Sequence, residues 1–442
     1  MPARGFQLLR HRAFIALLDQ AAVSIASFGT GILLSRAFVG GRREQLGLYY
    51  LAVTIGILIG ELQNALICTP LTVIAPTVSP KERRRFNGSA MIHHACLSAL
   101  ITLAIATLGL CAPALGIASH QPMLLACSIT AGAIGLRNFA RFLNFSLHRP
   151  HIACATDWLV TAIQLSGIVV LVHTHRLTAS TAVGAIGVSS LIGGSLALAL
   201  STQFIQARVS TAWTDFRANW QLSRWVFASG VIGNIGTSIY PWVLDTFSGT
   251  LQAAVWGNCN TVSSVGNPLL MGLQNWMAPA IAHAYADRPR EQFRRYVIRY
   301  ASLFLMILPA MLLALGVLST PLLHRLYRDF SPNTTALVFL LAAGSLVQSV
   351  GFVFTRGLFS LGRGALDVWT NALPILVLIV CAVPLVHRFG ALGGAISLLL
   401  AQILATGVRA VLFWKVAHEQ PLENEAAVAT LVPLSATSME AA

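Results

Sequence analysis

Twelve apolar stretches, each about 20 residues or longer, leave this chain few ways to fold. Hydrophobic residues make up 56% of its 442 residues and charged residues 10%, against roughly 25% charged in soluble domains. A soluble fold of this size could not cover so much apolar surface, so the chain is expected to fold in a bilayer. The expected spans are 13–38, 47–76, 88–116, 122–147, 152–173, 180–205, 222–248, 252–285, 296–318, 334–361, 366–386 and 389–416.

The basic residues predict the orientation of these spans. With the amino terminus in the cytoplasm, cytoplasmic segments hold about 18 Lys and Arg and external loops about six. This bias follows the positive-inside rule and places both termini in the cytoplasm. The net charge of +14 is therefore explained by topology, which argues against a nucleic-acid partner.

The second half of the chain repeats short motifs of the first half in the same order. Leu62-Gln63-Asn64 recurs as Leu273-Gln274-Asn275, and Phe145-Ser146-Leu147-His148-Arg149 recurs as Phe359-Ser360-Leu361-Gly362-Arg363. The offsets of 211 and 214 are nearly constant, as a duplicated six-helix bundle requires. Many membrane transporters are built from such repeats, with the substrate path between them.

The repeat predicts a domain organisation. Residues 1–205 would form one six-helix lobe and residues 222–417 the other. In the linker 206–221, aromatic residues recur at helical spacing (Trp213, Phe216 and Trp220), as expected of a short amphipathic helix in the cytoplasmic headgroup layer. Residues 418–442 carry four glutamates and no long apolar run, and are expected to form a mostly disordered tail.

Five arginines fall inside the expected spans, where an ionised group is costly unless it faces water or a partner. Arg137 and Arg141 lie mid-span, four residues apart and so on one helical face. Two interpretations remain open for this pair: an anion site facing a cavity, or salt bridges with Asp157, Glu61 or Asp19. The other three arginines are weaker candidates for binding an anion: Arg36, Arg356 and Arg409.

Acidic residues inside the spans are candidates for binding a coupling ion or for pairing with these arginines. Glu61 lies closest to mid-span and has the uncharged Gly272 as its counterpart in the second half. Asp19 and Asp157 lie nearer the cytoplasmic ends of their spans. Neutral polar residues at the repeated motif and beside Arg137 are candidate gating positions: Gln63, Asn64, Gln274, Asn275 and Asn138.

Prolines in the second and eighth spans also suggest gating. Pro70 and Pro76 follow the first Leu-Gln-Asn motif, while Pro268 and Pro279 flank the second. Proline removes a backbone hydrogen bond, and an interrupted membrane helix is tolerated where it lines protein or water.

Enzyme and cofactor signatures are absent from the sequence. It contains no P-loop, no Gly-x-Ser-x-Gly and no His-Glu-x-x-His, and its histidine pairs lack nearby Cys or acidic partners. We therefore expect neither an enzyme nor a resident cofactor or metal. A transporter without a nucleotide site must use an ion gradient, the membrane potential or the gradient of its own substrate.

The chain resembles the MOP exporter superfamily, with its MATE-like fold. The resemblance is carried by the two six-span halves, by Leu18-Asp19-Gln20, by Gly47-Leu48-Tyr49-Tyr50 and by the two Phe-Ser-Leu-x-Arg motifs. It covers roughly residues 10–415. Within the superfamily the chain looks most like polysaccharide exporters and Wzx-type flippases, which move polyprenyl-pyrophosphate-linked oligosaccharides across the plasma membrane.

That resemblance implies a function. Arg137 and Arg141 would receive the pyrophosphate between two alternating lobes, a proton or sodium ion would be the coupling ion, and membrane lipids and the polysaccharide polymerase or glycosyltransferase machinery would be partners. The alternative is a MATE-type exporter of organic cations that uses Asp19 and Asp157. Arginines equal or outnumber acidic residues inside the spans, which favours an anionic cargo.

Overall fold

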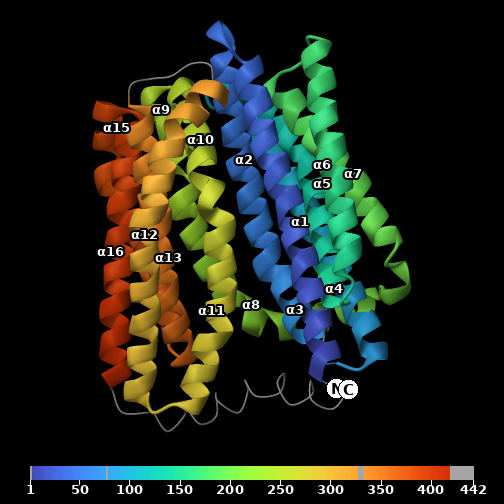
Figure 1. Cartoon of the computed structure of the whole chain (residues 1–442). Helices are drawn as coiled ribbons and strands as arrows, with labels where there is room; N and C mark the ends of the chain where they lie inside the picture. The colour runs from blue at the N-terminus through green and yellow to red at the C-terminus, as the bar shows by residue number, and fades with distance from the viewer. Residues whose placement is uncertain (1, 76–77, 327–332, 419–442) are drawn as a thin grey trace. The chain divides into compact units, whose positions relative to one another are not determined.

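The computed structural model describes residues 2–75, 78–326 and 333–418, and in these ranges every regular element is a helix (Figure 1). The first half comprises α1 (Pro2–Ala37), α2 (Arg43–Gln63), α3 (Thr69–Ile74), α4 (Pro80–Cys111), α5 (Gln121–Ser146), α6 (Pro150–His173) and α7 (Ala179–Ala199). The second comprises α8 (Val209–Ser238), α9 (Tyr240–Ser248), α10 (Thr250–Ser263), α11 (Asn267–Asp287), α12 (Arg290–Leu326), α13 (Thr334–Ser360), α14 (Ala365–Val377), α15 (Val383–Phe389) and α16 (Ala391–His418). The all-helical prediction is confirmed.

Ten helical stretches within the described ranges are long and apolar enough to cross a membrane, as expected of a multi-pass membrane protein. They match all six expected spans of the first half and the last four of the second. The expected seventh and eighth spans are each divided into two helices. The count of twelve is consistent with this arrangement, although two of the twelve are not single helices.

Proline explains both divisions. The seventh expected span is split into α8 and α9 at Ile239, two residues before Pro241, and the eighth into α10 and α11 by a 3₁₀ turn at Ser264–Gly266, two residues before Pro268. A proline lacks the N–H that would continue the helix and is tolerated in a first turn. The prediction of breaks beside proline is confirmed for the eighth span.

Two further spans contain a π-helical turn, at Asn64–Cys68 between α2 and α3 and at Leu378–Ala382 between α14 and α15. In both, a proline at the second position of the next helix, Pro70 or Pro384, follows the turn. The proline ring crowds the carbonyl four residues earlier, which here lies inside the π turn. Such bulges recur at functional positions of helices.

The expected linker is not a separate element. Residues 209–221 form the first turns of α8, which continues without interruption to Ser238. The expected boundary at 221/222 therefore falls inside a helix. Residues 419–442, which contain almost all of the expected tail, lie outside the described residues, as does Pro76.

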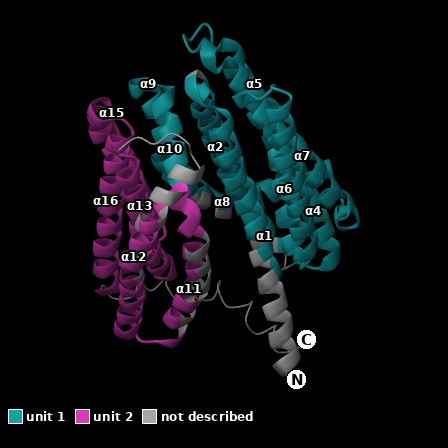
Figure 2. Cartoon of the chain, turned by 45° about the horizontal axis from the view of Figure 1, so that its top comes forward, with its two compact units in different colours: residues 1–261, 323–330 teal, residues 262–322, 331–442 magenta. Residues whose placement is uncertain are grey.

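The chain divides into two compact units (Figure 2). Unit 1 contains residues 1–261 and 323–330, and unit 2 contains residues 262–322 and 331–442. The helices α8 and α9 and all but the last two residues of α10 thus belong to unit 1. The units do not follow the sequence halves, and the two six-helix lobes stay a prediction.

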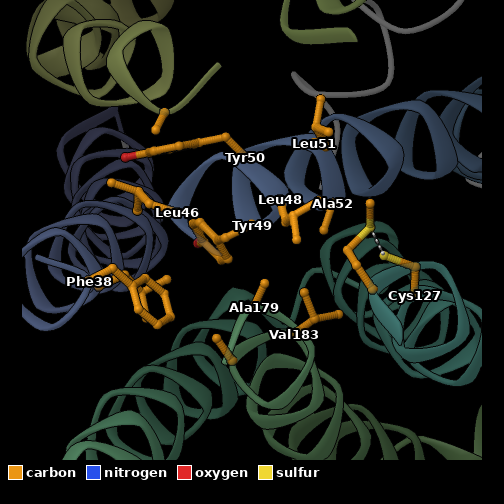
Figure 3. Close-up of a cluster of buried hydrophobic side chains, with 14 of the residues drawn as sticks. Phe38, Leu46, Leu48, Tyr49, Tyr50, Leu51, Ala52, Cys127, Ala179 and Val183 are labelled. Atoms are coloured by element: carbon orange, nitrogen blue, oxygen red, sulfur yellow. Dashed lines mark hydrogen bonds between the residues drawn. The ribbon is translucent and has the colours of Figure 1, made fainter. Parts of the chain in front are cut away.

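The largest buried cluster of unit 1 lies where α1, α2, α5 and α7 meet (Figure 3). Phe38, Leu51 and Leu124 are almost wholly buried there, and Cys127 Sγ lies 3.7 Å from Met123 Sδ. Lipid tails are as apolar as these side chains, so close packing rather than transfer from water stabilises such contacts. A large buried cluster of unit 2 joins α11, α12, α13 and α16 around Phe293 and Phe413.

The two Phe-Ser-Leu-x-Arg motifs end their helices in the same way. The amides of Leu147, His148 and Arg149 bond to the carbonyls of Leu143, Phe145 and Asn144, and those of Leu361, Gly362 and Arg363 to Gly357, Phe359 and Leu358. The fourth motif residue has a left-handed backbone in both, with φ of 58° at His148 and 71° at Gly362. A shared helix end at motifs 214 residues apart is local support for the duplication.

Candidate functional site

The candidate site of unit 1 is built on α5, which carries Arg137 and Arg141 one turn apart. This helix packs closely on α7 because α7 has a glycine at the contact. A Cβ atom at Gly194 would lie only 2.8 Å from the backbone nitrogen of Arg137, so any larger residue would push α5 away. Small residues at helix crossings are the usual means of close approach in membranes.

Both arginines pair with buried aspartates from other helices. Arg137 Nε donates to Asp157 Oδ1 of α6 at 2.8 Å. Arg141 Nε donates to Asp19 Oδ2 of α1 at 3.1 Å, its terminal nitrogen contacts the same oxygen, and its Nε lies 3.0 Å from Asp157 Oδ2. Two cations and two anions therefore form one cluster, called here the Asp–Arg cluster. Of the two interpretations that the sequence left open, the salt bridges to Asp19 and Asp157 are present.

The two kinds of charge in the Asp–Arg cluster differ in accessibility. The carboxylates of Asp19 and Asp157 are each 1% exposed, whereas the side chains of Arg137 and Arg141 are 16% and 24% exposed. The arginine side chains are therefore the accessible part of the cluster. Arg141 also lies over the ring of Phe145, 5.4 Å from its centre.

The carboxylates are not fully satisfied. Asp19 Oδ1 is buried and receives no hydrogen bond from any described residue, and the buried Asp157 Oδ2 has only its ion-pair contact with Arg141. Arg141 contacts both carboxyl groups, so the two share one guanidinium. A proton on either carboxyl would supply the missing donor and leave one arginine charge uncompensated.

Glu61 does not join the Asp–Arg cluster. It is half-buried on α2 and accepts a hydrogen bond from Asn234 of α8, and a Cβ atom at Gly230 of α8 would lie 3.6 Å from Oε2. Within the described part of the chain Glu61 forms no ion pair with an arginine. Asn138, half-buried on α5, faces the same region of α2, since its side-chain nitrogen lies 3.8 Å from a Cβ atom built at Gly60.

Gln63 lies directly before the π turn and is almost wholly buried. Its Nε2 donates to the carbonyl of Gly135 at 2.6 Å and lies 3.2 Å from Nδ1 of His94, whose ring stacks on Phe139. Gln63 Oε1 has no described hydrogen-bond donor. Asn64, the first residue of the π turn, is half-buried. Gln63 thus joins α2 to α4 and α5 where the backbone of the second span is irregular.

Unit 2 contains a different charged cluster. Arg409 of α16 is 6% exposed and donates from Nε to Asp367 Oδ1 of α14 at 3.1 Å, while Thr355 and Asn371 donate to the same carboxylate at 2.8 and 3.0 Å. Thr355 occupies the position 214 residues after Arg141. The second half therefore has a threonine where the first half has Arg141, and the arginine of its cluster, Arg409, comes from α16.

The remaining candidates form no ion pair or hydrogen bond with either cluster among the described contacts. Arg356 is exposed on α13 and stacks over Phe352 at 4.5 Å, and Arg36 is exposed near the end of α1. Gln274 of α11 donates to Ser349 Oγ of α13 at 3.1 Å. The side chain of Asn275 lies outside the described residues.

Sequence reasoning did not find a row of polar contacts that joins the first helices to α9 and α10 within unit 1. Asn258 accepts hydrogen bonds from Ser35 at 2.7 Å and from Tyr50 at 2.9 Å, and Trp242 donates to Thr54 at 2.8 Å. His120 Nε2 lies 2.8 Å from Asp245 Oδ2. Each residue is an isolated polar position in an apolar stretch, so only long-range packing brings them together. Among the described side chains, no group of three His, Cys, Asp or Glu could hold a metal.

No protein family model and no curated protein matches this chain. Solved structures do match. An inward-facing multidrug-resistance MATE transporter of the MOP superfamily superposes with a TM-score of 0.73 at 14% identity, over 89% of this chain and 94% of that one. The lipid II flippase MurJ, in an inward closed conformation, gives 0.67 at 15% identity, over 96% and 93%. A Vibrio cholerae MATE transporter gives 0.62 at 14% identity, over 94% and 97%. The chain thus has the MATE-like fold that the sequence predicted.

Proposed function

We propose that this protein is an ion-coupled transporter of the MOP superfamily that moves polyprenyl-pyrophosphate-linked oligosaccharide across the plasma membrane, for polysaccharide export. Its two lobes would open alternately to the cytoplasm and to the outside. The fold supports the class of transporter, because both MATE transporters and a lipid flippase share it. The cargo is inferred from the chemistry of the site.

The observation that carries the proposal is the unequal accessibility of charge in the Asp–Arg cluster. The side chains of Arg137 and Arg141 are partly exposed, while those of Asp19 and Asp157 are buried. A guanidinium group binds phosphate oxygens through two parallel hydrogen bonds, so a pyrophosphate fits this arrangement better than an organic cation does. The polyprenyl chain would stay in the bilayer.

The buried carboxylates supply a route for ion coupling. Asp19 and Asp157 compete with an incoming anion for the arginines, and protonation of either would end that competition. Other titratable groups near the cluster are Cys154 on α6 and Cys68 in the π turn, and α7 carries none. Anion binding should therefore strengthen as pH falls, and Asp19→Asn should bind more tightly than wild type at neutral pH with a smaller pH dependence.

A second candidate function is export of organic cations, as in the MATE-type alternative. Two features favour it: buried aspartates in the first and fifth spans, and the structural match to MATE transporters. Under this alternative a cation would have to displace Arg137 and Arg141 to reach the carboxylates. Neutralising these arginines would then improve transport rather than abolish it.

The deciding experiment measures transport of both cargoes by one set of variants. Wild type and the double variant Arg137→Gln, Arg141→Gln would each be expressed in two strains. One strain lacks its own polysaccharide flippase and the other lacks its drug exporters. We expect wild type to restore surface polysaccharide, the double variant to restore less than a tenth of it, and neither to confer drug resistance. Membrane protein level, with Arg295→Gln as an exposed arginine control, corrects for expression. Drug resistance conferred by wild type without polysaccharide rescue would establish the alternative.

A further inference from the structure

Residues 209–224, the first four turns and more of α8, have two unlike faces. One face packs on α4 through specific contacts: Ser89 Oγ donates to Asp215 Oδ2 at 2.6 Å, and His93 Nε2 lies 2.8 Å from the carbonyl oxygen of Ala212. On the same face Asn219 is 5% exposed and Ser223 1%. This face of α8 is therefore packed against the N-terminal part of α4.

The other face carries an exposed stripe of alternating aromatic and basic residues. Trp213, Arg217, Trp220 and Arg224 follow one another at intervals of four, three and four residues, which places them along one side of the helix. Trp213 is 62% exposed and Trp220 41%, and both arginines are exposed. We call these four residues the Trp–Arg stripe.

Arg217 is held in place by stacking. Its guanidinium lies over the ring of Trp213, 5.2 Å from the centre, and Phe216 stacks between Trp213 and Trp220 at 5.7 and 6.0 Å. Trp213, Phe216, Arg217 and Trp220 line an open hollow of roughly 420 Å³. Among the described residues Arg217 forms no ion pair, because Asp215 is turned toward Ser89 and Arg85. The hollow is thus an apolar surface with one cation beside it.

A phospholipid headgroup fits this chemistry. Indole rings prefer the boundary between headgroups and acyl chains, and an arginine there binds phosphate oxygens. The stripe also lies where such headgroups are, because α8 continues from it into the expected seventh span. Positive charge beside a membrane favours anionic over zwitterionic lipid.

We propose that the Trp–Arg stripe binds the headgroups of anionic phospholipids at the cytoplasmic surface of the membrane. The aromatic rings would lie among the upper acyl chains, with Arg217 and Arg224 on the phosphates. The stripe lies outside the Asp–Arg cluster, so this lipid site is independent of the transported cargo.

Native mass spectrometry of the purified full-length protein tests the proposal. Detergent-solubilised protein would be titrated separately with phosphatidylglycerol, phosphatidylcholine and inorganic pyrophosphate. We expect phosphatidylglycerol to bind more tightly than phosphatidylcholine, with little competition from pyrophosphate. The double variant Arg217→Gln, Arg224→Gln should bind phosphatidylglycerol about fivefold more weakly for each arginine removed. Its binding of phosphatidylcholine should be nearly unchanged.

Two matched controls make the result specific. Arg295→Gln removes an exposed arginine, with a side chain 76% exposed, from α12, and Trp369→Leu removes a tryptophan that is 75% exposed on α14. The double variant Trp213→Leu, Trp220→Leu should bind both lipids more weakly, whereas the two control variants should bind both as wild type does. Thermal unfolding in detergent checks that each variant stays folded. The proposal is overturned if phosphatidylglycerol binds the arginine variant as it binds wild type, if Arg295→Gln shows the same loss, or if a photo-crosslinker at Trp213 in membranes captures protein instead of lipid.

Discussion

Asp19 and Arg141 pose the central question at the scale of single residues, because a buried ion pair can be structural, functional or both. Removing one partner of a buried pair leaves an uncompensated charge and costs about 3–5 kcal/mol, whereas replacing both by neutral groups is often tolerated. Single substitutions at the Asp–Arg cluster therefore cannot separate loss of folding from loss of binding. Paired substitutions can.

We predict that Arg141→Met destabilises the protein and that adding Asp19→Asn restores most of the stability. Transport by the double variant should stay below a tenth of wild type, because the accessible guanidinium is gone although the fold is intact. Thermal unfolding and transport would be measured on the same preparations. Full transport by the stable double variant would show that Arg141 serves folding alone.

Arg409 and Asp367 provide the contrasting case. Their cluster is closed, since Arg409 is 6% exposed and its carboxylate partner also accepts from Thr355 and Asn371. We predict that Arg409→Met destabilises the protein and that Arg409→Met with Asp367→Asn regains both stability and at least half of the transport. Loss of transport in a stable double variant would instead return Arg409 to the anion site that the sequence suggested.

At the scale of elements, the two Phe-Ser-Leu-x-Arg helix ends form a matched pair with different residues at the left-handed position. His148 adopts φ of 58° where the second half has Gly362 at 71°. A side chain in this conformation costs roughly 1–2 kcal/mol, which glycine avoids. The first half therefore carries local strain that its repeat does not.

Exchanging these residues tests the equivalence of the repeats. We predict that His148→Gly raises the melting temperature and that Gly362→His lowers it, each by a few degrees, with a change in stability of about 1 kcal/mol. Fluorescence-monitored unfolding in detergent measures both. Shifts of the same sign would mean that the two helix ends are not equivalent.

For the whole molecule, the distribution of basic residues predicts which loops face the cytoplasm. Cysteines introduced at Arg84 and Arg294 should react with a membrane-impermeant maleimide only after the cells are permeabilised, because these loops face the cytoplasm. A cysteine at Arg176 should react in intact cells. Of the seven native cysteines, Cys96 and Cys111 are exposed and need replacement first. Labelling of positions 84 and 176 from one side would contradict the alternation of spans in the first half.

The sequence alone determined the features that depend on composition and local spacing. Apolar length predicted the all-helical class and twelve spans, of which ten are long apolar helices in the described ranges. A chain in a bilayer can pair its backbone groups only within helices or closed barrels. Proline beside the second Leu-Gln-Asn motif predicted the break in the eighth span, because a missing N–H acts locally. The family resemblance predicted the MATE-like fold, which the structural matches confirm.

Tertiary structure decided what depends on contacts between distant segments. Spacing placed Arg137 and Arg141 on one face but could not choose between an anion and the salt bridges, since Asp19 lies 122 residues from Arg141. Spacing could not show that Glu61 faces Asn234 or that α8 belongs to unit 1. Nor could it show that Asn258 accepts hydrogen bonds from Ser35 and Tyr50. In a chain this apolar nearly every helix face is hydrophobic, so the pattern carries little information about which faces meet. Close packing and a few buried polar contacts make that choice.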